Sequence, residues 1–331
     1  MVGVQVLDHY YLTITLLVTV GYQMLGFIVA WTLQFDKITD FTGGSNFFIL
    51  ALMTLLFART NDARNIVASV LVMIWAARLA GFLFFRVLKT GSDNRFDDIR
   101  SHFFKYLGFW VGQILWVWVV SLPVTIINSP SVIGINHSAP FGTSRDIAGI
   151  VLWGIGWAVE SLADIQKYQF KASKPPKDEP CRKGLWYFSR HPPYFGEILC
   201  WWGIWILCLS ADDNLGNQGR AALKGSVVSP IFTTLLLMFG SGIPIAEKTQ
   251  GQKFYTIAYG SNTRQNNPDV WQKYQGYLRS TSILIPVPPV LYRPLPKILK
   301  RTLLLDLPIY QFGEKEGDEV VEEQRNRSSQ P

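Results

Sequence analysis

Long apolar runs alternate with short polar connectors along the whole chain. Each run approaches the roughly 20 residues that cross the hydrocarbon core of a bilayer. The runs also lack the regular polar face that surface helices of soluble proteins carry. The seven runs are 11–33, 41–58, 66–88, 107–128, 146–163, 194–210 and 227–246. The pattern predicts an all-α, polytopic membrane protein with about seven transmembrane helices in one bundle.

Composition supports this prediction over a large soluble protein with buried helices. Of the 331 residues, 49% are hydrophobic and only 17% are charged. Soluble domains carry about 25% charged residues. The mean hydropathy of +0.17 agrees with a membrane protein.

Basic residues are concentrated in alternate connectors. If the seven runs all span, 25 of the 31 Lys and Arg residues fall on one side, in 34–40, 86–106, 164–193 and the C-terminal tail. Lys and Arg are enriched in cytoplasmic loops, so we expect the C-terminus to be cytosolic. The chain has a net charge of +7, but its basic residues lie beside apolar spans. Membrane topology and anionic ligands explain such residues, and we therefore expect no nucleic-acid partner.

We divide the chain into three regions. Residues 1–65 form N-terminal transmembrane helices, and residues 66–292 form the membrane catalytic region. Residues 293–331 form a cytosolic tail that is first basic and apolar, as in interfacial segments. Its end, from residue 313, is polar and charged, a composition that predicts disorder.

Metal and disulfide chemistry have no support in the sequence. The three cysteines show no paired framework, and the four histidines are scattered, so we expect neither disulfides nor a metal site.

Arg78 lies in the middle of the third apolar run. Burying a charge in hydrocarbon costs several kcal/mol, so an intramembrane arginine is a candidate catalytic residue. The structural alternative is an ion pair with a buried acid such as Glu160.

The densest group of polar and aromatic residues precedes and enters the sixth run. Arg190 and His191 come first, two prolines follow that favour a helix start, and Tyr194 and Glu197 then lie inside the run. Basic side chains at a helix N-terminus suit the phosphates of an anionic cofactor. The alternative is a membrane-interface loop with an aromatic belt, which leaves Glu197 unexplained.

At these residues the chain resembles the steroid 5-alpha-reductase-like membrane proteins, in particular a branch that carries an uncharacterised domain related to the reductase C-terminal domain. The resemblance extends over residues 66–286 and is carried by several short stretches. They are Trp75-x-x-Arg78-Leu79, Gly91-x-Asp93-x-Arg95-Phe96, Ala163-Asp164-x-Gln166-Lys167-x-x-Phe170-Lys171, Gly184-Leu185-Trp186-x-x-Ser189-Arg190-His191-Pro192-x-Tyr194-Phe195-Gly196-Glu197, Trp201-Trp202-Gly203, Ser241-Gly242-Ile243-Pro244 and Tyr274-x-x-Tyr277.

The resemblance implies a helix bundle that binds NADPH on its cytosolic side and reduces the carbon–carbon double bond of a steroid or other lipid enone. It also implies a location in the endoplasmic reticulum. Carried over by position, the cofactor-binding residues are Arg95, Asp164, Lys171, Arg190, His191, Tyr194 and Glu197.

Two positions depart from the family pattern. Pro193 stands where the branch has asparagine, which removes a side-chain hydrogen bond to the nicotinamide end. Trp75 stands where the steroid reductases carry a tyrosine acid, and an indole cannot donate that proton. Tyr194 is the alternative proton donor, beside Arg78 as the second candidate catalytic residue.

Two other functions stay open. Isoprenylcysteine methyltransferases share a similar Arg-His-Pro-x-Tyr-x-Gly segment and bind S-adenosylmethionine, but they carry paired glutamates where this chain has Glu247 followed by Lys248. A non-catalytic lipid-binding membrane protein would explain Trp75 and Pro193.

Overall fold

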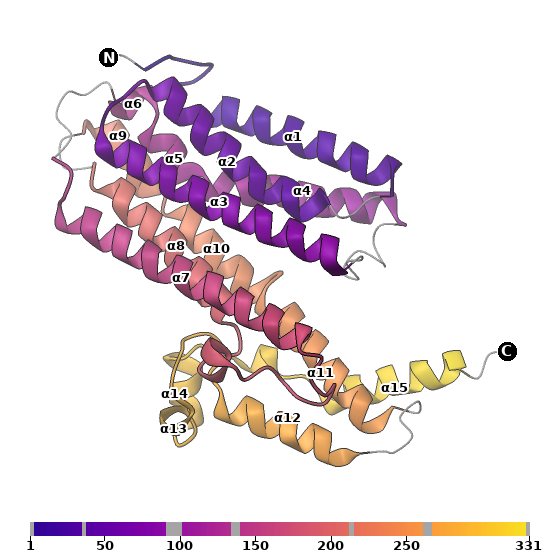
Figure 1. Ribbon diagram of the computed structural model, residues 1–331. Helices are drawn as coiled ribbons and strands as arrows, with labels where there is room; N and C mark the ends of the chain where they lie inside the picture. Colours follow the sequence, from indigo (N-terminus) through magenta and orange to yellow (C-terminus); the bar gives the residue numbers. More distant parts are fainter. Residues whose placement is uncertain are drawn as a thin grey trace. The chain divides into compact units, whose positions relative to one another are not determined.

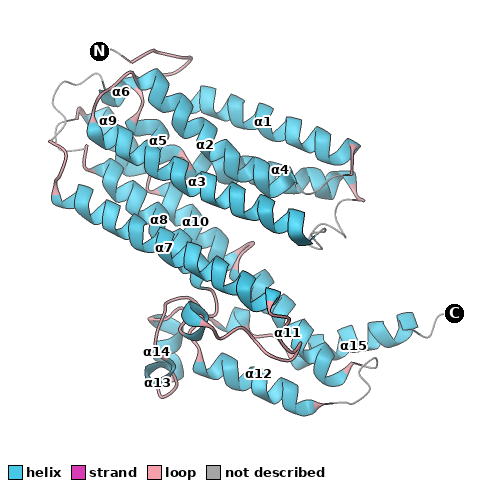
Figure 2. Cartoon of the chain, viewed as in Figure 1, coloured by secondary structure: helices cyan, strands magenta, loops and turns pink. Residues whose placement is uncertain are grey.

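The computed structural model describes residues 3–34, 38–90, 101–133, 140–211, 215–260 and 267–328. Within these ranges the regular structure is helical and contains no β-strand, which confirms the all-α prediction (Figure 1, Figure 2). The chain divides into two compact units. Unit 1 comprises 1–155 and 199–233, and unit 2 comprises 156–198 and 234–331.

The elements follow one another as a series of long apolar helices and shorter polar ones. They are α1 Leu12–Thr32, α2 Thr39–Ala58, α3 Ala63–Thr90, α4 Phe103–Val120, α5 Leu122–Ile127, α6 Pro130–Ile133, α7 Ser144–Ala172, η3 Gly184–Tyr187, α8 Pro192–Leu209, α9 Asn217–Gly225, α10 Val228–Phe239, α11 Ile243–Tyr259, α12 Pro268–Ser280, α13 Pro289–Tyr292, α14 Lys297–Thr302, η5 Pro308–Tyr310 and α15 Glu314–Ser328.

Six helical segments of the described chain are long and apolar enough to cross a membrane, against about seven expected. They are Leu12–Thr32, Thr39–Ala58, Ala63–Leu83, Phe103–Val120, Ser144–Ala172 and Asn217–Tyr259. The difference lies at α8, which has 18 residues, includes Glu197 and is not among the six. The fourth expected run is also divided, because α4 ends at Val120 and α5 begins just before Pro123.

An aspartate outside the first span orders the start of α1. The carboxylate of Asp8 accepts hydrogen bonds from the backbone N–H groups of Tyr10 at 2.7 Å, Leu12 at 3.1 Å and Thr13 at 2.6 Å. The first N–H groups of a helix have no partner within the helix, so this side chain satisfies groups that would otherwise need water.

Small residues let the helices of unit 1 approach closely. A Cβ atom built on Gly44 of α2 would lie 3.1 Å from the Cβ of Ala80 on α3, and one built on Gly26 of α1 would lie 2.7 Å from the Trp110 ring of α4. Small residues at such contacts are typical of helix packing in membranes, where backbones must come close to gain van der Waals contact.

Buried amides connect three of these helices. Gln23 of α1 donates to the side chain of Asn46 on α2 at 3.0 Å, and Gln113 of α4 donates to Gln23 at 2.8 Å. Asn128 similarly donates to Ser69 at 3.0 Å and accepts from Asn65 at 3.0 Å. Interhelical hydrogen bonds of this kind satisfy polar groups that would be costly to leave unpaired away from water.

A buried ion pair joins the beginnings of α3 and α7. Arg64 Nε lies 2.7 Å from Asp146 Oδ1, and Nη2 lies 2.9 Å from Oδ2. The Asp146 carboxylate also accepts from the backbone N–H groups of Gly142 and Thr143. Two parallel guanidinium–carboxylate hydrogen bonds and the additional backbone donors together offset the free-energy cost of removing both charges from water.

Glycines also set the spacing between α7 and α8. Within unit 1, a Cβ on Gly149 would lie 2.7 Å from the carbonyl oxygen of Gly203, and one on Gly203 would lie 2.6 Å from that of Gly149. Within unit 2, a Cβ on Gly196 would lie 2.5 Å from the carbonyl oxygen of Gly156. Both contacts leave no room for a side chain, so the two helices cross backbone to backbone.

Trp75 belongs to an aromatic cluster in the interior of unit 1. Its ring centroid lies 5.2 Å from that of Phe47 and 4.8 Å from that of Trp201, and Trp116 packs on Phe47 at 4.9 Å. Trp75 is fully buried, and the gap that it and Trp201 border has no room for a water molecule. The indole is therefore part of the core of unit 1.

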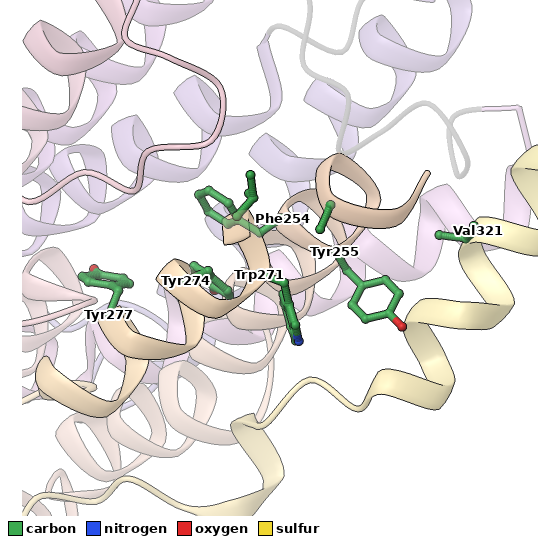
Figure 3. Close-up of a cluster of buried hydrophobic side chains, with 8 residues drawn as sticks. Phe254, Tyr255, Trp271, Tyr274, Tyr277 and Val321 are labelled. Carbon is green, nitrogen blue, oxygen red and sulfur yellow. The ribbon is translucent and has the colours of Figure 1, made fainter. Parts of the chain in front are cut away.

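The core of unit 2 joins α11, α12 and α15. Phe254 stacks on Tyr274 with ring centroids 4.3 Å apart, and Trp271 contacts Tyr255 edge-on at 5.1 Å (Figure 3). The composition of the segment from residue 313 predicts disorder, whereas residues 314–328 form α15. Its Val321 is buried in this cluster, and Asp318 accepts a hydrogen bond from the Tyr255 hydroxyl at 2.6 Å. Tertiary packing thus outweighs the polar composition of the segment.

Candidate functional site

The segment before α8 is held by a strand-like pairing with the chain beyond α12. Ser189 forms an isolated parallel bridge with Ser282. The Arg190 N–H donates to Ser282 O at 2.8 Å, and the His191 N–H donates to Ile283 O at 3.1 Å. Pro192 then begins α8. The first N–H groups of a helix have no partner within the helix, so a proline at this position loses no hydrogen bond. This backbone pairing fixes the direction in which both basic side chains leave the chain.

Arg190 and His191 share one carboxylate. Arg190 Nη1 lies 2.6 Å from Glu247 Oε2, and His191 Nε2 lies 2.6 Å from Glu247 Oε1. All three side chains are buried in unit 2. Each oxygen of Glu247 therefore has its own partner, as a buried carboxylate requires.

A second acid completes the environment of the guanidinium. Arg190 Nη2 lies 2.9 Å from Asp306 Oδ1, and Asp306 in turn accepts a hydrogen bond from the Tyr292 hydroxyl. Burial by itself would lower the pKa of Arg190, but attraction to Glu247 and Asp306 outweighs burial and raises that pKa above its ordinary value. Burial, followed by the hydrogen bond to Asp306, raises the pKa of Tyr292. Arg190 is therefore a fixed cation and Tyr292 a neutral donor.

A cavity of about 350 Å³ opens beside this network. Its wall includes Arg190 and Asp306, together with basic side chains from α12 and α14. These basic residues are Arg279, Lys297, Lys300 and Arg301. Since Asp306 is the one acid among the lining residues, the cavity has a strong excess of positive charge. Arg190 Nε is buried and has no hydrogen-bond partner among the described residues.

Tyr194 lies next to the network on the first turn of α8. Its ring stacks on the His191 ring, with centroids 5.4 Å apart and planes 13° from parallel. On its other side it packs against a hydrophobic cluster that includes Ile243, Ile283 and Tyr310. The phenol is therefore held between a polar network and an apolar surface, which is a suitable place for a residue that contacts both a cofactor and a lipid.

The remaining predicted residues of unit 2 lie along α7 and α8. Asp164 and Glu197 are half-buried, and Lys171 is exposed on the last turn of α7. None of these three lines the cavity beside Arg190 or a second cavity of about 660 Å³, which Phe170, Arg182, Lys183, Lys273 and Arg293 border with other residues. The structure thus brings Arg190, His191 and Tyr194 together, and of the six predicted residues in unit 2 only Arg190 lines either of these two cavities.

The two remaining predicted site residues are Arg78 and Arg95. Arg78 is on α3 in unit 1, and Glu160, its expected alternative partner, is on α7 in unit 2. Arg95 falls in 91–100, outside the described residues.

Pro193 forms part of the first turn of α8, where proline is favourable. Among the described residues there is no group of three or more His, Cys, Asp or Glu that could hold a metal ion.

Sequence reasoning missed the acids of the network. Tyr292 is the last residue of the region that we expected to be catalytic. Glu247 is a single acid within α11, and Asp306 lies in the segment that we expected to be a cytosolic tail. Glu247 and Asp306 lie 57 and 116 residues after Arg190 in the sequence, so no short motif connects them to Arg190. The one available signal was charge balance, because a buried arginine next to a helix start requires acids from elsewhere in the chain.

Comparison with known proteins gives one match. A family model described as "Protein of unknown function (DUF1295)" matches residues 26–264. No curated protein and no solved structure matches the chain. The match places the chain in an uncharacterised family, while the link to steroid 5-alpha-reductases stays an expectation. Because the matched residues make up more than half of its length, this chain belongs to the DUF1295 family of proteins of unknown function.

Proposed function

We propose that the chain is an NADPH-dependent reductase that acts on a carbon–carbon double bond of a steroid or other lipid enone within the membrane. The observation that carries the proposal is the cationic cavity beside Arg190, at the start of an apolar helix. We also propose a cytosolic C-terminus, because the basic residues are concentrated on that side of the expected spans. We propose a location in the endoplasmic reticulum because of the resemblance to the steroid 5-alpha-reductase-like proteins.

The residues present fit a ligand with several phosphate groups. Arg279, Lys297, Lys300 and Arg301 border the cavity with Asp306 as the one acid among its lining residues, and Asp306 already pairs with Arg190. The guanidinium of Arg190 is part of the same wall and adds to its positive charge. S-adenosylmethionine has a sulfonium and no phosphate, so this wall suits it less well.

NADPH supplies a hydride for the β-carbon of the enone, and a proton then completes the reduction at the α-carbon. The chain's own residues have three tasks in this proposal. The basic cavity wall binds the phosphates, Glu247 keeps Arg190 and His191 in place, and Tyr194 donates a hydrogen bond to the carbonyl oxygen. A donor at that oxygen lowers the barrier because negative charge develops there as the hydride is transferred.

The test is ligand-induced thermal stabilisation of the detergent-purified protein. A ligand that binds only the folded state at a concentration of 100 times its Kd adds about 2.7 kcal/mol to the free energy of unfolding. We expect NADPH to raise the Tm and Arg279→Gln to reduce the shift, while Lys315→Gln on the exposed surface of α15 keeps it. Lys171→Ala and Glu197→Ala test whether these residues contact the cofactor.

Other outcomes identify the other functions. A shift with S-adenosylmethionine and none with NADPH would replace the reductase with a methyltransferase. A shift with neither, together with no oxidation of NADPH in the presence of enone lipids, would leave a lipid-binding protein without catalysis.

A further inference from the structure

The segment between α12 and α15 presents large apolar side chains to its surroundings. Val290 and Leu291 on α13 are 78% and 61% exposed, Ile298 and Leu303 at α14 are 68% and 65% exposed, and Ile309 in η5 is 60% exposed. We call these five residues the apolar tip. Monomeric proteins seldom keep a contiguous apolar patch open to water, so such a surface marks a contact with a partner or a membrane.

The segment that carries the apolar tip is firmly held rather than a loose tail. Tyr292, the last residue of α13, is fully buried, with its hydroxyl bound to Asp306. Asp306 N–H donates to Lys300 O at 2.9 Å, and the Lys300 ammonium lies 4.3 Å from the centre of the Tyr292 ring. The apolar side chains are thus displayed on a fixed support, and their exposure is a property of the fold.

The short helix α14 is amphipathic. At 100° per residue, Lys297, Lys300 and Arg301 lie on one side, and Ile298, Leu299 and Leu303 lie on the other. The basic side borders the cavity next to Arg190, while Ile298 and Leu303 of the apolar side are exposed. Arg293 is a further exposed cation between α13 and α14.

The same segment starts at the place where the chain enters an apolar helix. Phe188 O accepts from the Val287 N–H at 3.1 Å, and His191 N–H donates to Ile283 O, immediately before Pro192 begins α8. α13 therefore begins two residues after a backbone contact with the segment that leads into α8.

We propose that the apolar tip inserts into the leaflet of an anionic membrane next to the helix bundle, with Arg293 and Lys297 bound to acidic lipid headgroups. Exposed cations next to exposed aliphatic side chains are the combination that binds anionic lipid surfaces. A soluble protein partner would not need these cations, and the spanning segments anchor the chain in a membrane. Lys297 also borders the cavity assigned to the cofactor, so the docking is measured without nucleotide.

Lipid-chain quenching of a fluorescent label tests the proposal. The three native cysteines are buried, so a cysteine introduced at an exposed position can be labelled selectively. The variants are Ile298→Cys, Val290→Cys and, as the water-exposed reference, Glu319→Cys on α15. Each is placed in nanodiscs of phosphatidylcholine, with or without phosphatidylserine, that contain acyl-chain-brominated lipid and no nucleotide.

We expect quenching at 298 and 290, none at 319, and a further loss of fluorescence at 298 and 290 when phosphatidylserine is added. Arg293→Gln with Lys297→Gln is expected to remove the phosphatidylserine effect, and Lys315→Gln, an exposed charge change on α15, to leave it intact. Equal quenching at all three labels would overturn insertion. Quenching that does not depend on phosphatidylserine would overturn the role of acidic headgroups.

Discussion

Arg190 and Glu247 form a buried ion pair, with Nη1 and Oε2 2.6 Å apart, across 57 residues of sequence. The pair links the start of α8 to the interior of α11, and His191 binds the second oxygen of the same carboxylate. The local structure beside the cationic cavity therefore depends on one acid.

Replacing that acid should destabilise the protein strongly. In Glu247→Gln, Arg190 loses one of its two charged partners and keeps Asp306. Removing one partner from a buried ion pair costs about 3–5 kcal/mol. We expect a loss of that size in the free energy of unfolding, measured by denaturation in detergent.

A double-mutant cycle provides the control. Glu247→Leu with Arg190→Met removes both charges, and we expect this pair to cost less than the sum of the two single changes. Strict additivity of the two single effects would contradict an energetic coupling between Arg190 and Glu247.

The crossing of α7 and α8 offers a matched pair of glycines. Gly149→Ala would place Cβ 2.7 Å from the Gly203 carbonyl oxygen, which forces the helices apart and should cost about 1–3 kcal/mol. Gly154→Ala, on the same helix, has no heavy atom within 4 Å of its Cβ. It should be neutral or stabilise by about 0.5–1 kcal/mol, because alanine favours a helix. Equal melting temperatures for the two variants would argue against the close crossing.

Asp8 should make stability depend on pH in the acid range. Burial by itself would raise its pKa, but hydrogen bonds from the backbone of Thr13 and Tyr10 lower it below the ordinary value. A carboxyl with a lowered folded pKa stabilises the protein above its unfolded pKa of about 3.9. This stabilisation is lost as the pH falls through the folded value. Asp8→Asn should therefore show a shallower loss of stability below pH ~4; a curve parallel to that of the unchanged protein would contradict the prediction.

Trp75 tests whether the aromatic cluster is structural. Trp75→Ala should destabilise the protein by about 3–5 kcal/mol, because it removes a large buried ring from a closely packed core. Ile74→Ala, at an exposed position on the same helix, should have a much smaller effect on the unfolding curve. If Trp75→Ala changed only ligand binding, and left the Tm as it was, the structural role would be wrong.

Hydropathy alone was enough to predict the long apolar helices. Every expected apolar run falls on a helix, because a bilayer forces the backbone to satisfy its hydrogen bonds within each segment. The break at Pro123 and the helix at 314–328 were not predictable in the same way. The break depends on local geometry, and α15 depends on Tyr255 and Val321 as tertiary partners.

The site was predictable only in part. Arg190, His191 and Tyr194 stood out because charged and aromatic residues gathered at a proline-marked helix start. Glu247 and Asp306 did not, because their partners are distant in sequence and nothing in their neighbours marks them as buried. Long-range charge pairing is a property of the folded chain, and one sequence does not show it.

The ion pair of Arg64 with Asp146 has a consequence for biosynthesis. Arg64 emerges from the ribosome 82 residues before Asp146, so α3 is made before the carboxylate of its buried ion pair. The native environment of the Arg64 side chain can then form only after the start of α7 has been made. Chains truncated before residue 146 should consequently be retained by membrane quality control, even though α1 to α4 are complete.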